Sequence, residues 1–312
     1  MNPSSLVLPV LALVLAPLLP GIINRTKAKF AGRKGQPLLQ LYFDLAKLLK
    51  KGAVYSRTTS WIFRAGPVVG LASAVAALFV LPLGGNPAPL TFPGDAVLLA
   101  YFLGVMRFFT VAAALDTGSS FEGMGASREV QFSALAEPTL LLGLAAISRA
   151  GVVLPSEPGL LLSLSEMYAR LNIAAWAHSG PALLMVAGAL MVVFLAENSR
   201  IPVDDPNTHL ELTMIHEVMV LDHSGPDFAM ILYGASLKMW IIGALLVGVL
   251  IPMRSGSLLL DGAVLVLGQF LLAVATGVVE STMARLRMMR VPQLLVGAGF
   301  LSTLALALVF WS

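Results

Sequence analysis

The chain contains no cysteine and few charged residues. Without thiols it forms no disulfide, no thiolate-bound zinc site and no cysteine-ligated iron–sulfur cluster. Charged residues make up 12% of the 312 positions, about half the ~25% typical of soluble domains. No P-loop and no G-x-G-x-x-G turn is present, and no nucleophile–His–acid set is apparent. We therefore expect no nucleic-acid partner and no catalysis by the chain alone.

Long apolar runs are what the sequence does contain, since 57% of its residues are hydrophobic. Several runs are about 20 residues long, enough to cross a bilayer core of roughly 30 Å as a helix. No basic residue precedes the first run and no cleavage site follows it, so we do not expect a signal peptide. We predict an all-α polytopic membrane protein, one integral membrane domain over residues 1–312. Its eight predicted spans are Ser4–Ile23, Gly66–Gly84, Ala96–Leu115, Val130–Ser148, Gly180–Leu195, Ala229–Ile251, Leu258–Val279 and Gln293–Trp311.

The basic residues between the spans favour one side of the membrane. Fifteen Lys and Arg residues fall in the connections at about 24–65, 116–129, 196–228 and 280–292. The opposite side has three, Arg149, Arg170 and Arg254. Because basic loops stay cytoplasmic, we predict that these four connections face the cytoplasm. Both termini then lie on the outer side of a plasma (inner) membrane.

Two connections are expected to contain short helices. In Gln36–Lys51 the apolar residues recur at i, i+3, i+4, i+7, i+10 and i+11, which predicts an amphipathic helix of about four turns on the cytoplasmic membrane face. This helix could be a generic interfacial anchor or one wall of an interface with a peripheral partner. On the outer side, Leu154–Ala177 is expected to contain a short surface helix.

Several ionisable residues fall inside or at the ends of the predicted spans. They are Arg107, Glu137, Glu197, Lys238 and Glu280. A charge near mid-membrane costs about 2.5–3.5 kcal/mol on insertion scales, so it normally faces the protein interior and has a partner or a task. Two interpretations remain open at this point: a buried chain that conducts protons or couples charge, and static ion pairs that fix helix packing.

The connection at Ala196–Asp227 concentrates titratable groups, with seven of the 17 carboxylates and three of the four histidines. Pro202 is expected to end the preceding helix, and Arg200 to pair with Glu197 or Asp204. The run after Pro206 is predicted to form a short helix that ends near Ser224. Its apolar content indicates that spans or a partner cover it.

The three histidines of this connection do not suit a shared metal. His209, His216 and His223 are spaced by seven residues, or about 10.5 Å of helical rise from one to the next. The zinc-protease pattern H-E-x-x-H is also absent. No metal site is expected.

Four stretches resemble one known family. E-x-x-R-x-P-x-D at Glu197–Asp204, followed by Glu211-Leu212 and Asp222-His223-Ser224-Gly225, resembles the signature of the H subunit of respiratory complex I, called subunit 1 in mitochondria. The other three stretches agree with that family in order along the chain. They are GRKGQPLLQLYFDLAKLL at Gly32–Leu49, GASREVQFSALAEP at Gly125–Pro138 and ESTMARLRMMR at Glu280–Arg290.

The departures from that pattern favour one branch of the family. Asn207 and His209 stand where quinone-reducing members have glutamates. The strings D-T-G-S-x-F at Asp116–Phe121 and G-A-S-R-E at Gly125–Glu129 are similar to the related subunit of membrane-bound group 4 [NiFe] hydrogenases and formate hydrogenlyase.

This resemblance implies a membrane-anchor and coupling subunit of a multi-subunit oxidoreductase of the hydrogenase-4 or formate hydrogenlyase type. Such a subunit docks cytoplasmic large and small redox subunits and links electron transfer to ion translocation by antiporter-like membrane subunits. The NiFe centre and iron–sulfur clusters are expected in those partners, with no cofactor bound by this chain. The alternatives are the quinone-site subunit of a complex I-type NADH:quinone oxidoreductase and, in another class, a stand-alone secondary ion transporter.

Two sets of candidate residues follow from these interpretations. The charge-relay and coupling set is Arg107, Glu137, Glu197, Asp204, Glu211, Lys238 and Glu280. The cytoplasmic docking or junction set is Arg33, Lys34, Asp44, Lys47, Arg128, Glu129, Arg200, Asp222, Arg285 and Arg287.

Overall fold

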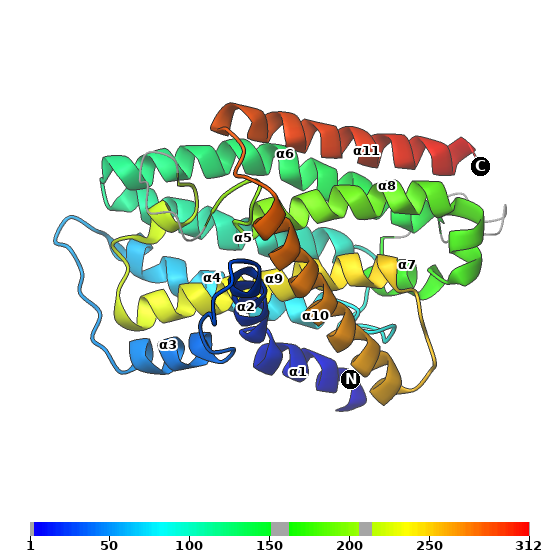
Figure 1. The fold of residues 1–312 in the computed structure, drawn as a ribbon, viewed down its shortest axis with the longest axis horizontal. Coiled ribbons are helices and arrows are strands. Elements are labelled where there is room, and N and C mark those ends of the chain that lie inside the picture. Colours follow the sequence, from blue (N-terminus) through cyan, green and yellow to red (C-terminus); the bar gives the residue numbers. More distant parts are fainter. Residues whose placement is uncertain (1–2, 151–161, 206–213, 312) are drawn as a thin grey trace.

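The computed structural model describes residues 3–150, 162–205 and 214–311, and these parts form helices and connecting loops without a β-strand (Figure 1). Most of the long helices are apolar on all sides, as expected for helices buried among other helices and lipid. The α-helices are α1 Val7–Leu15, α2 Leu18–Phe30, α3 Gln40–Leu49, α4 Trp61–Val80, α5 Asp95–Asp116, α6 Ser120–Ala150, α7 Leu164–Arg170, α8 Ile173–Glu197, α9 Gly225–Leu250, α10 Leu258–Thr282 and α11 Val291–Trp311. Three short 3₁₀ helices are η1 Pro3–Leu6, η2 Glu217–Val220 and η3 Met288–Arg290.

The helix lengths agree with a polytopic membrane protein. Seven segments of the described chain are long and apolar enough to cross a membrane, and the pair α1–α2, bent by 43°, supplies an eighth if it forms one span. The bend falls at Pro17, which has no backbone N–H to continue the α1 hydrogen-bond ladder. The predicted all-α polytopic fold is therefore confirmed.

Among the starts of the predicted spans, the largest differences are those of α6 and α8. The helix α6 begins at Ser120 instead of Val130, so most of the predicted loop at 116–129 is helical. The helix α8 begins at Ile173 instead of Gly180, because its first turns precede a kink at Ser179, two residues before Pro181. Polar first turns and a proline kink both shorten the apolar signal that sequence analysis detects.

The two short helices that the sequence predicts are present in modified form. The amphipathic helix is α3, shorter than predicted at Gln40–Leu49, with Pro37 three residues before it. It is tied to α1 by the Tyr42 hydroxyl, which donates to the Val14 carbonyl. The short helix predicted within Leu154–Ala177 is α7, whose Leu164, Met167 and Tyr168 are buried.

The prediction of a helix after Pro206 is wrong for the described part of that segment, residues 214–224. Residues 206–213, including His209 and Glu211, lie outside the described residues. From Met214 onward the chain is a loop in which only η2 is helical. The Asp204 carboxylate accepts the backbone N–H groups of Ile215 and His216 at 3.2 and 3.3 Å, and this pairing holds the segment in a loop.

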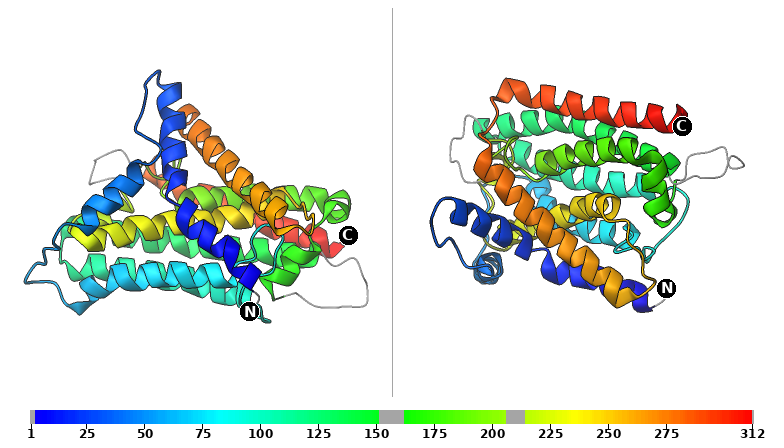
Figure 2. Two further views of the ribbon diagram at one scale, coloured as in Figure 1. Left: turned by 90° about the horizontal axis from the view of Figure 1, so that it is seen from below. Right: turned by 45° about the vertical axis from the view of Figure 1, so that its right-hand side comes forward.

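Both termini lie towards the same end of the bundle, the right-hand end in Figure 1. The connections from α3 to α4, α5 to α6 and α10 to α11, and the described part of the connection from α8 to α9, lie towards the opposite end (Figures 1 and 2). The helix α4 packs on α5 and α9, α11 packs on α6 and α8, and α2 packs on α10. This arrangement brings α5, α6, α8 and α9 together around the charged residues.

Candidate functional site

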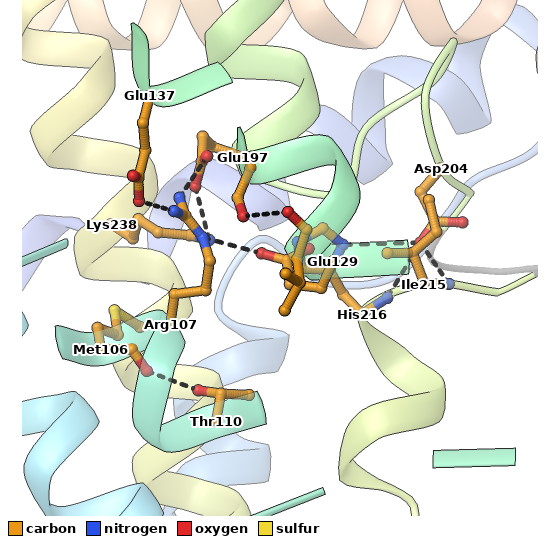
Figure 3. Close-up of polar contacts among 12 residues, drawn as sticks. Met106, Arg107, Thr110, Glu129, Glu137, Glu197, Asp204, Ile215, His216 and Lys238 are labelled. Carbon is orange, nitrogen blue, oxygen red and sulfur yellow. Dashed lines mark hydrogen bonds and ion pairs between the residues drawn. The ribbon is translucent and has the colours of Figure 1, made fainter. Parts of the chain in front are cut away.

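Arg107 on α5 is the hub of a cluster of buried charges (Figure 3). Its Nε lies 3.2 Å from Glu129 Oε1, its Nη2 lies 2.5 Å from Glu197 Oε1, and its Nη1 pairs with Glu137. Glu129 and Glu137 are eight residues apart on α6, or about 12 Å of helical rise. A planar guanidinium with five N–H donors can reach several carboxylates that a single ammonium could not.

A second cation joins the cluster from α9. Lys238 Nζ lies 3.6 Å from Glu197 Oε2, so the Glu197 carboxylate at the end of α8 lies between Lys238 and Arg107. Four helices, α5, α6, α8 and α9, thus contribute to one cluster of three carboxylates and two cations. Each charge has a neighbour of opposite sign, the usual condition for burying ionised groups.

The cluster continues into the connection between α8 and α9. His216 Nε2 lies 3.0 Å from Glu129 Oε2, and His216 Nδ1 lies 3.8 Å from Asp204 Oδ2. The other Asp204 oxygen lies 2.9 Å from Arg285 Nη2, after α10. We call this path the buried ionic chain. Its members are Lys238, Glu197, Arg107, Glu129, His216, Asp204 and Arg285, with Glu137 as a branch on Arg107.

The local charges determine how the loop members of the chain are protonated. Burial lowers the pKa of His216, but the charge of Glu129 and contact with Asp204 outweigh it and raise the pKa to about 9. Burial raises the pKa of Asp204, but His216, Arg285 and the backbone donors outweigh it, and the pKa falls below its ordinary value. Near neutral pH, His216 is therefore protonated and Asp204 ionised.

Arg200 and Glu280 form a separate group. Glu280 Oε2 lies 2.7 Å from Lys27 Nζ, and Glu280 Oε1 lies 3.5 Å from Arg200 Nη1. The expectation that Arg200 pairs with Glu197 or Asp204 is therefore wrong. Glu197 and Asp204 are near Arg200 in sequence, but they pair with Arg107 and Arg285. The helix α10 places Glu280 beside Arg200 instead.

The structure divides the predicted docking set between the surface and the interior. Arg128 donates to the Met214 carbonyl at 2.7 Å, and Glu129 lies inside the buried ionic chain because α6 extends through this region. The Asp222 backbone N–H donates to Glu122, a buried carboxylate that sequence analysis did not select. The exposed or partly exposed members are Arg33, Lys34, Asp44, Lys47, Arg128, Asp222, Arg285 and Arg287, whereas Glu129 and Arg200 are buried.

Of the predicted relay residues, five lie in the buried ionic chain or on its branch and Glu280 lies in the separate group with Arg200. The five are Arg107, Glu137, Glu197, Asp204 and Lys238. The sequence predicts no relay role for His216 and places Glu129 in a loop. The eight-residue spacing of Glu129 and Glu137 is a signal that both residues lie on one side of a single helix. Nothing in the sequence shows that His216 meets Glu129.

A cavity of about 540 Å³ opens beside the buried ionic chain. Its walls come from α4, α5, α9 and the connection between α8 and α9, and they are largely apolar. Glu197, Arg200, His216 and Lys238 line one part of it. Within the described ranges, no group of three or more His, Asp or Glu side chains is arranged to hold a metal ion.

The chain is similar to known proteins over most of its length. Formate hydrogenlyase subunit 4 of Escherichia coli (strain K12) is 32% identical over 299 residues, 93% of each chain. Hydrogenase-4 component C of the same organism is 31% identical over 308 residues, 97% of this chain and 93% of that one. The H subunit of NADH-quinone oxidoreductase from Anaplasma phagocytophilum (strain HZ) is 28% identical over 225 residues, 67% of this chain and 62% of its own.

A solved structure and a family model agree with these relatives. A chain of the membrane-bound sulfane sulfur reductase, an archaeal respiratory membrane complex, has the same fold, with a TM-score of 0.81, 19% identity and 98% of both chains covered. The family model described as NADH dehydrogenase matches residues 4–312. These matches confirm the resemblance that the four sequence stretches indicate, and the chain belongs to the NADH dehydrogenase family.

Proposed function

We propose that this chain is the membrane-anchor and coupling subunit of a multi-subunit oxidoreductase of the hydrogenase-4 or formate hydrogenlyase type, in the plasma (inner) membrane. The observation that carries the proposal is the buried ionic chain. It connects Lys238 and Glu137, within spans, to Asp204 and Arg285, in the connections between spans. The relatives named for such complexes match over more than nine tenths of the chain.

In this proposal the redox chemistry belongs to partner subunits. The NiFe centre and iron–sulfur clusters lie in peripheral large and small subunits that dock on the predicted cytoplasmic connections. A change of charge or conformation there acts on Asp204 and His216. Because the linked groups lie 2.5–3.8 Å apart in a partly desolvated region, a change at one member alters the protonation and position of the next.

The branch at Glu137 supports a partner within the membrane. Its side chain is 47% exposed although it pairs with Arg107, whereas Glu129 and Glu197 are buried. A carboxylate within a span is costly to expose to lipid. We infer that a further membrane subunit, of the antiporter-like kind, covers this face of α6 and receives the coupled change from Glu137.

The test has two parts. The first is purification of the tagged chain in mild detergent from its native membrane, with subunit identification and nickel and iron analysis. The second is the double variant Glu197→Gln with Asp204→Asn, assayed in vesicles for ion translocation and, with an artificial electron donor, for redox turnover. We expect translocation to be lost while turnover remains. The control is Glu166→Gln, because Glu166 is an exposed residue of α7 that lies outside the buried ionic chain.

Three results would contradict the proposal. The double variant could assemble and translocate ions normally, which would show that the buried ionic chain is not needed for coupling. The protein could purify alone, in which case a stand-alone ion transporter becomes the better interpretation and ion flux in liposomes is the next assay. The particle could also contain iron–sulfur subunits without nickel.

That last result would favour the second candidate function, the quinone-site subunit of a complex I-type reductase. The cavity of about 540 Å³ favours it specifically, because it combines largely apolar walls with Arg200, His216 and Lys238. Such a cavity suits an apolar molecule with a polar head. Quinone-dependent electron transfer by the purified particle would distinguish this candidate from the hydrogenase type.

A further inference from the structure

His216 has a position in the buried ionic chain that no other residue shares. It is the contact between the part held by the spans, which ends at Glu129, and the part in the connections, which begins at Asp204. The ring lies between these two carboxylates, one 3.0 Å from Nε2 and the other 3.8 Å from Nδ1. Figure 3 shows His216 between the Glu129 and Asp204 sides of the cluster.

The other cations of the chain are unsuited to passing a proton between these carboxylates. Arg107 and Arg285 each end in a guanidinium, a group that is not deprotonated in proteins. Lys238 contacts Glu197 and reaches neither Glu129 nor Asp204 directly. An imidazole gains and loses protons at two separate nitrogens, so it alone can exchange with both sides.

The contacts of the two ring nitrogens also support proton exchange by His216. Neither ring nitrogen of His216 makes a properly aligned hydrogen bond, although both are buried from solvent. The carboxylate of Asp204, in contrast, is fixed by Arg285 and by two backbone N–H groups. The 3.8 Å contact can therefore close by rotation of the histidine ring, while the carboxylate stays in place.

We propose that His216 is the proton-carrying link between the membrane part of the buried ionic chain and its cytoplasmic junction, and that rotation of its ring makes and breaks this link. The proposal rests on the proposed function, because it assigns one step within that coupling. It concerns a proton at this point of the chain, whichever ion is translocated elsewhere.

The step balances without any redox partner. From the protonated ring, one N–H bond breaks as an O–H bond forms on the carboxylate that this nitrogen faces. Meanwhile the opposite carboxylate, which is ionised at rest, takes up a proton from its own side of the link, and rotation of the neutral ring presents the bare nitrogen to it. The O–H bond of that carboxyl group breaks as the N–H bond re-forms. The ring is then protonated again, the first carboxyl group has gained one proton, and the second has lost the proton that it received.

The charged surroundings set the pH at which the link works. Groups from every neighbouring element act on His216: Glu129 from α6, Asp204 from the connection after α8, and Lys238 from α9. Burial and the charge of Lys238 lower the pKa of His216, but Glu129 and Asp204 outweigh them and raise it to about 9. We expect ion translocation per redox turnover to fall as the pH rises through about 9, because the ring then no longer holds a proton.

The test uses the complete complex in proteoliposomes, with ion translocation measured at constant redox turnover. The variant His216→Ala is expected to translocate about a hundredfold more slowly, the usual scale of acid–base effects. Because His216 lines the cavity of about 540 Å³, added imidazole can occupy the vacated space and should restore translocation. The charged ring 1,3-dimethylimidazolium, which has no exchangeable ring proton, should not. Likewise, His216→Arg, which keeps the charge but never releases a proton, should remain slow.

The control is His178→Ala, an exposed histidine of α8 that lies outside both the buried ionic chain and the cavity. It should translocate at the normal rate. Restoration by 1,3-dimethylimidazolium or by His216→Arg would overturn the proposal, because charge alone would then suffice. Normal translocation by His216→Ala, with Glu197→Gln inactive, would also overturn it while leaving the proposed function intact. If Glu197→Gln were normal as well, the proposed function itself would fail.

Discussion

Arg107 compensates the negative charge of three carboxylates. Three carboxylates from two helices share its guanidinium, and two of them, Glu129 and Glu197, are buried. Lys238 alone could not neutralise them, because it contacts only Glu197. Removing Arg107 would leave buried negative charge without compensation, which is far costlier than losing an exposed ion pair.

We therefore predict that Arg107→Met is destabilised by roughly 3–5 kcal/mol, the scale for breaking a buried ion pair. Thermal unfolding in detergent would measure this as a lower Tm. Arg57→Met, which removes the same charge from an exposed position, should leave Tm almost unchanged. Adding Glu129→Gln to Arg107→Met should recover part of the loss, because it removes one uncompensated charge. Equal Tm values for both single variants would contradict the prediction.

His223 offers a test of pH dependence outside the buried ionic chain. Its ring stacks on Phe63, with 3.9 Å between centroids and 9° between planes. Burial lowers its pKa to about 4, against weaker opposition from Asp227 and Asp222. The folded pKa thus lies below the model-peptide value of about 6.5. The stability contributed by neutral His223 is present above pH 6.5 and is lost as the pH falls to about 4.

The prediction for His223 is a difference between two proteins. The change His223→Phe keeps the stack on Phe63 but cannot be protonated, so its Tm should fall less than that of the unsubstituted protein between pH 6.5 and 4. The difference should approach about 3 kcal/mol at the acid end. Parallel Tm curves over this range would show that His223 does not titrate as the structure indicates.

At the scale of elements, the contact between α6 and η2 sets the geometry of His216. The helix α6 has glycine at 125 where the loop crosses it. A Cβ there would lie 2.3 Å from Val218 Cγ1 and 2.8 Å from the Ile215 carbonyl oxygen. Backbone this close cannot be accommodated by a side-chain rotation, so the loop that presents His216 to Glu129 depends on the missing Cβ.

We predict that Gly125→Ala is destabilised by roughly 1–3 kcal/mol, the range for overpacked contacts. Because the loop must move away from α6, this variant should also translocate ions more slowly in the complex. The control is Gly123→Ala on the same helix, where a Cβ would meet nothing within 4 Å. That change should stabilise the protein slightly, by about 0.5–1 kcal/mol. A neutral Gly125→Ala would mean that the loop is not held against α6.

The elements also show why the site was only partly predictable. Apolar runs predicted the spans because each must be about 20 residues long to cross the membrane. They could not predict that α6 continues ten residues before its apolar part, which carries Glu129 into the interior. They also could not predict which helices are neighbours, since apolar surfaces between spans are chemically alike. The partners of Arg200 and His216 depend on that information.

For the whole molecule, the eight-span expectation and the positions of the termini are consistent with each other. An even number of crossings returns the chain to the side where it began, and both termini lie towards one end of the bundle (Figure 1). Which end faces the cytoplasm is a prediction from the basic residues. The positive-inside bias of fifteen to three supports the end with the connections from α3 to α4 and from α8 to α9.

The absence of natural cysteine makes this topology directly measurable. We predict that Thr91→Cys, between α4 and α5, reacts with a membrane-impermeant maleimide in intact cells, because it lies on the outer side. Lys51→Cys, between α3 and α4, should react only after the membrane is opened. Both positions are exposed, and labelling in denaturing detergent controls for accessibility within the assembled complex. The unsubstituted protein provides a background without thiols. The reverse labelling pattern would show that the protein has the opposite orientation in the membrane. Asp204, at the junction end of the buried ionic chain, would then lie outside, and cytoplasmic redox subunits could not dock there.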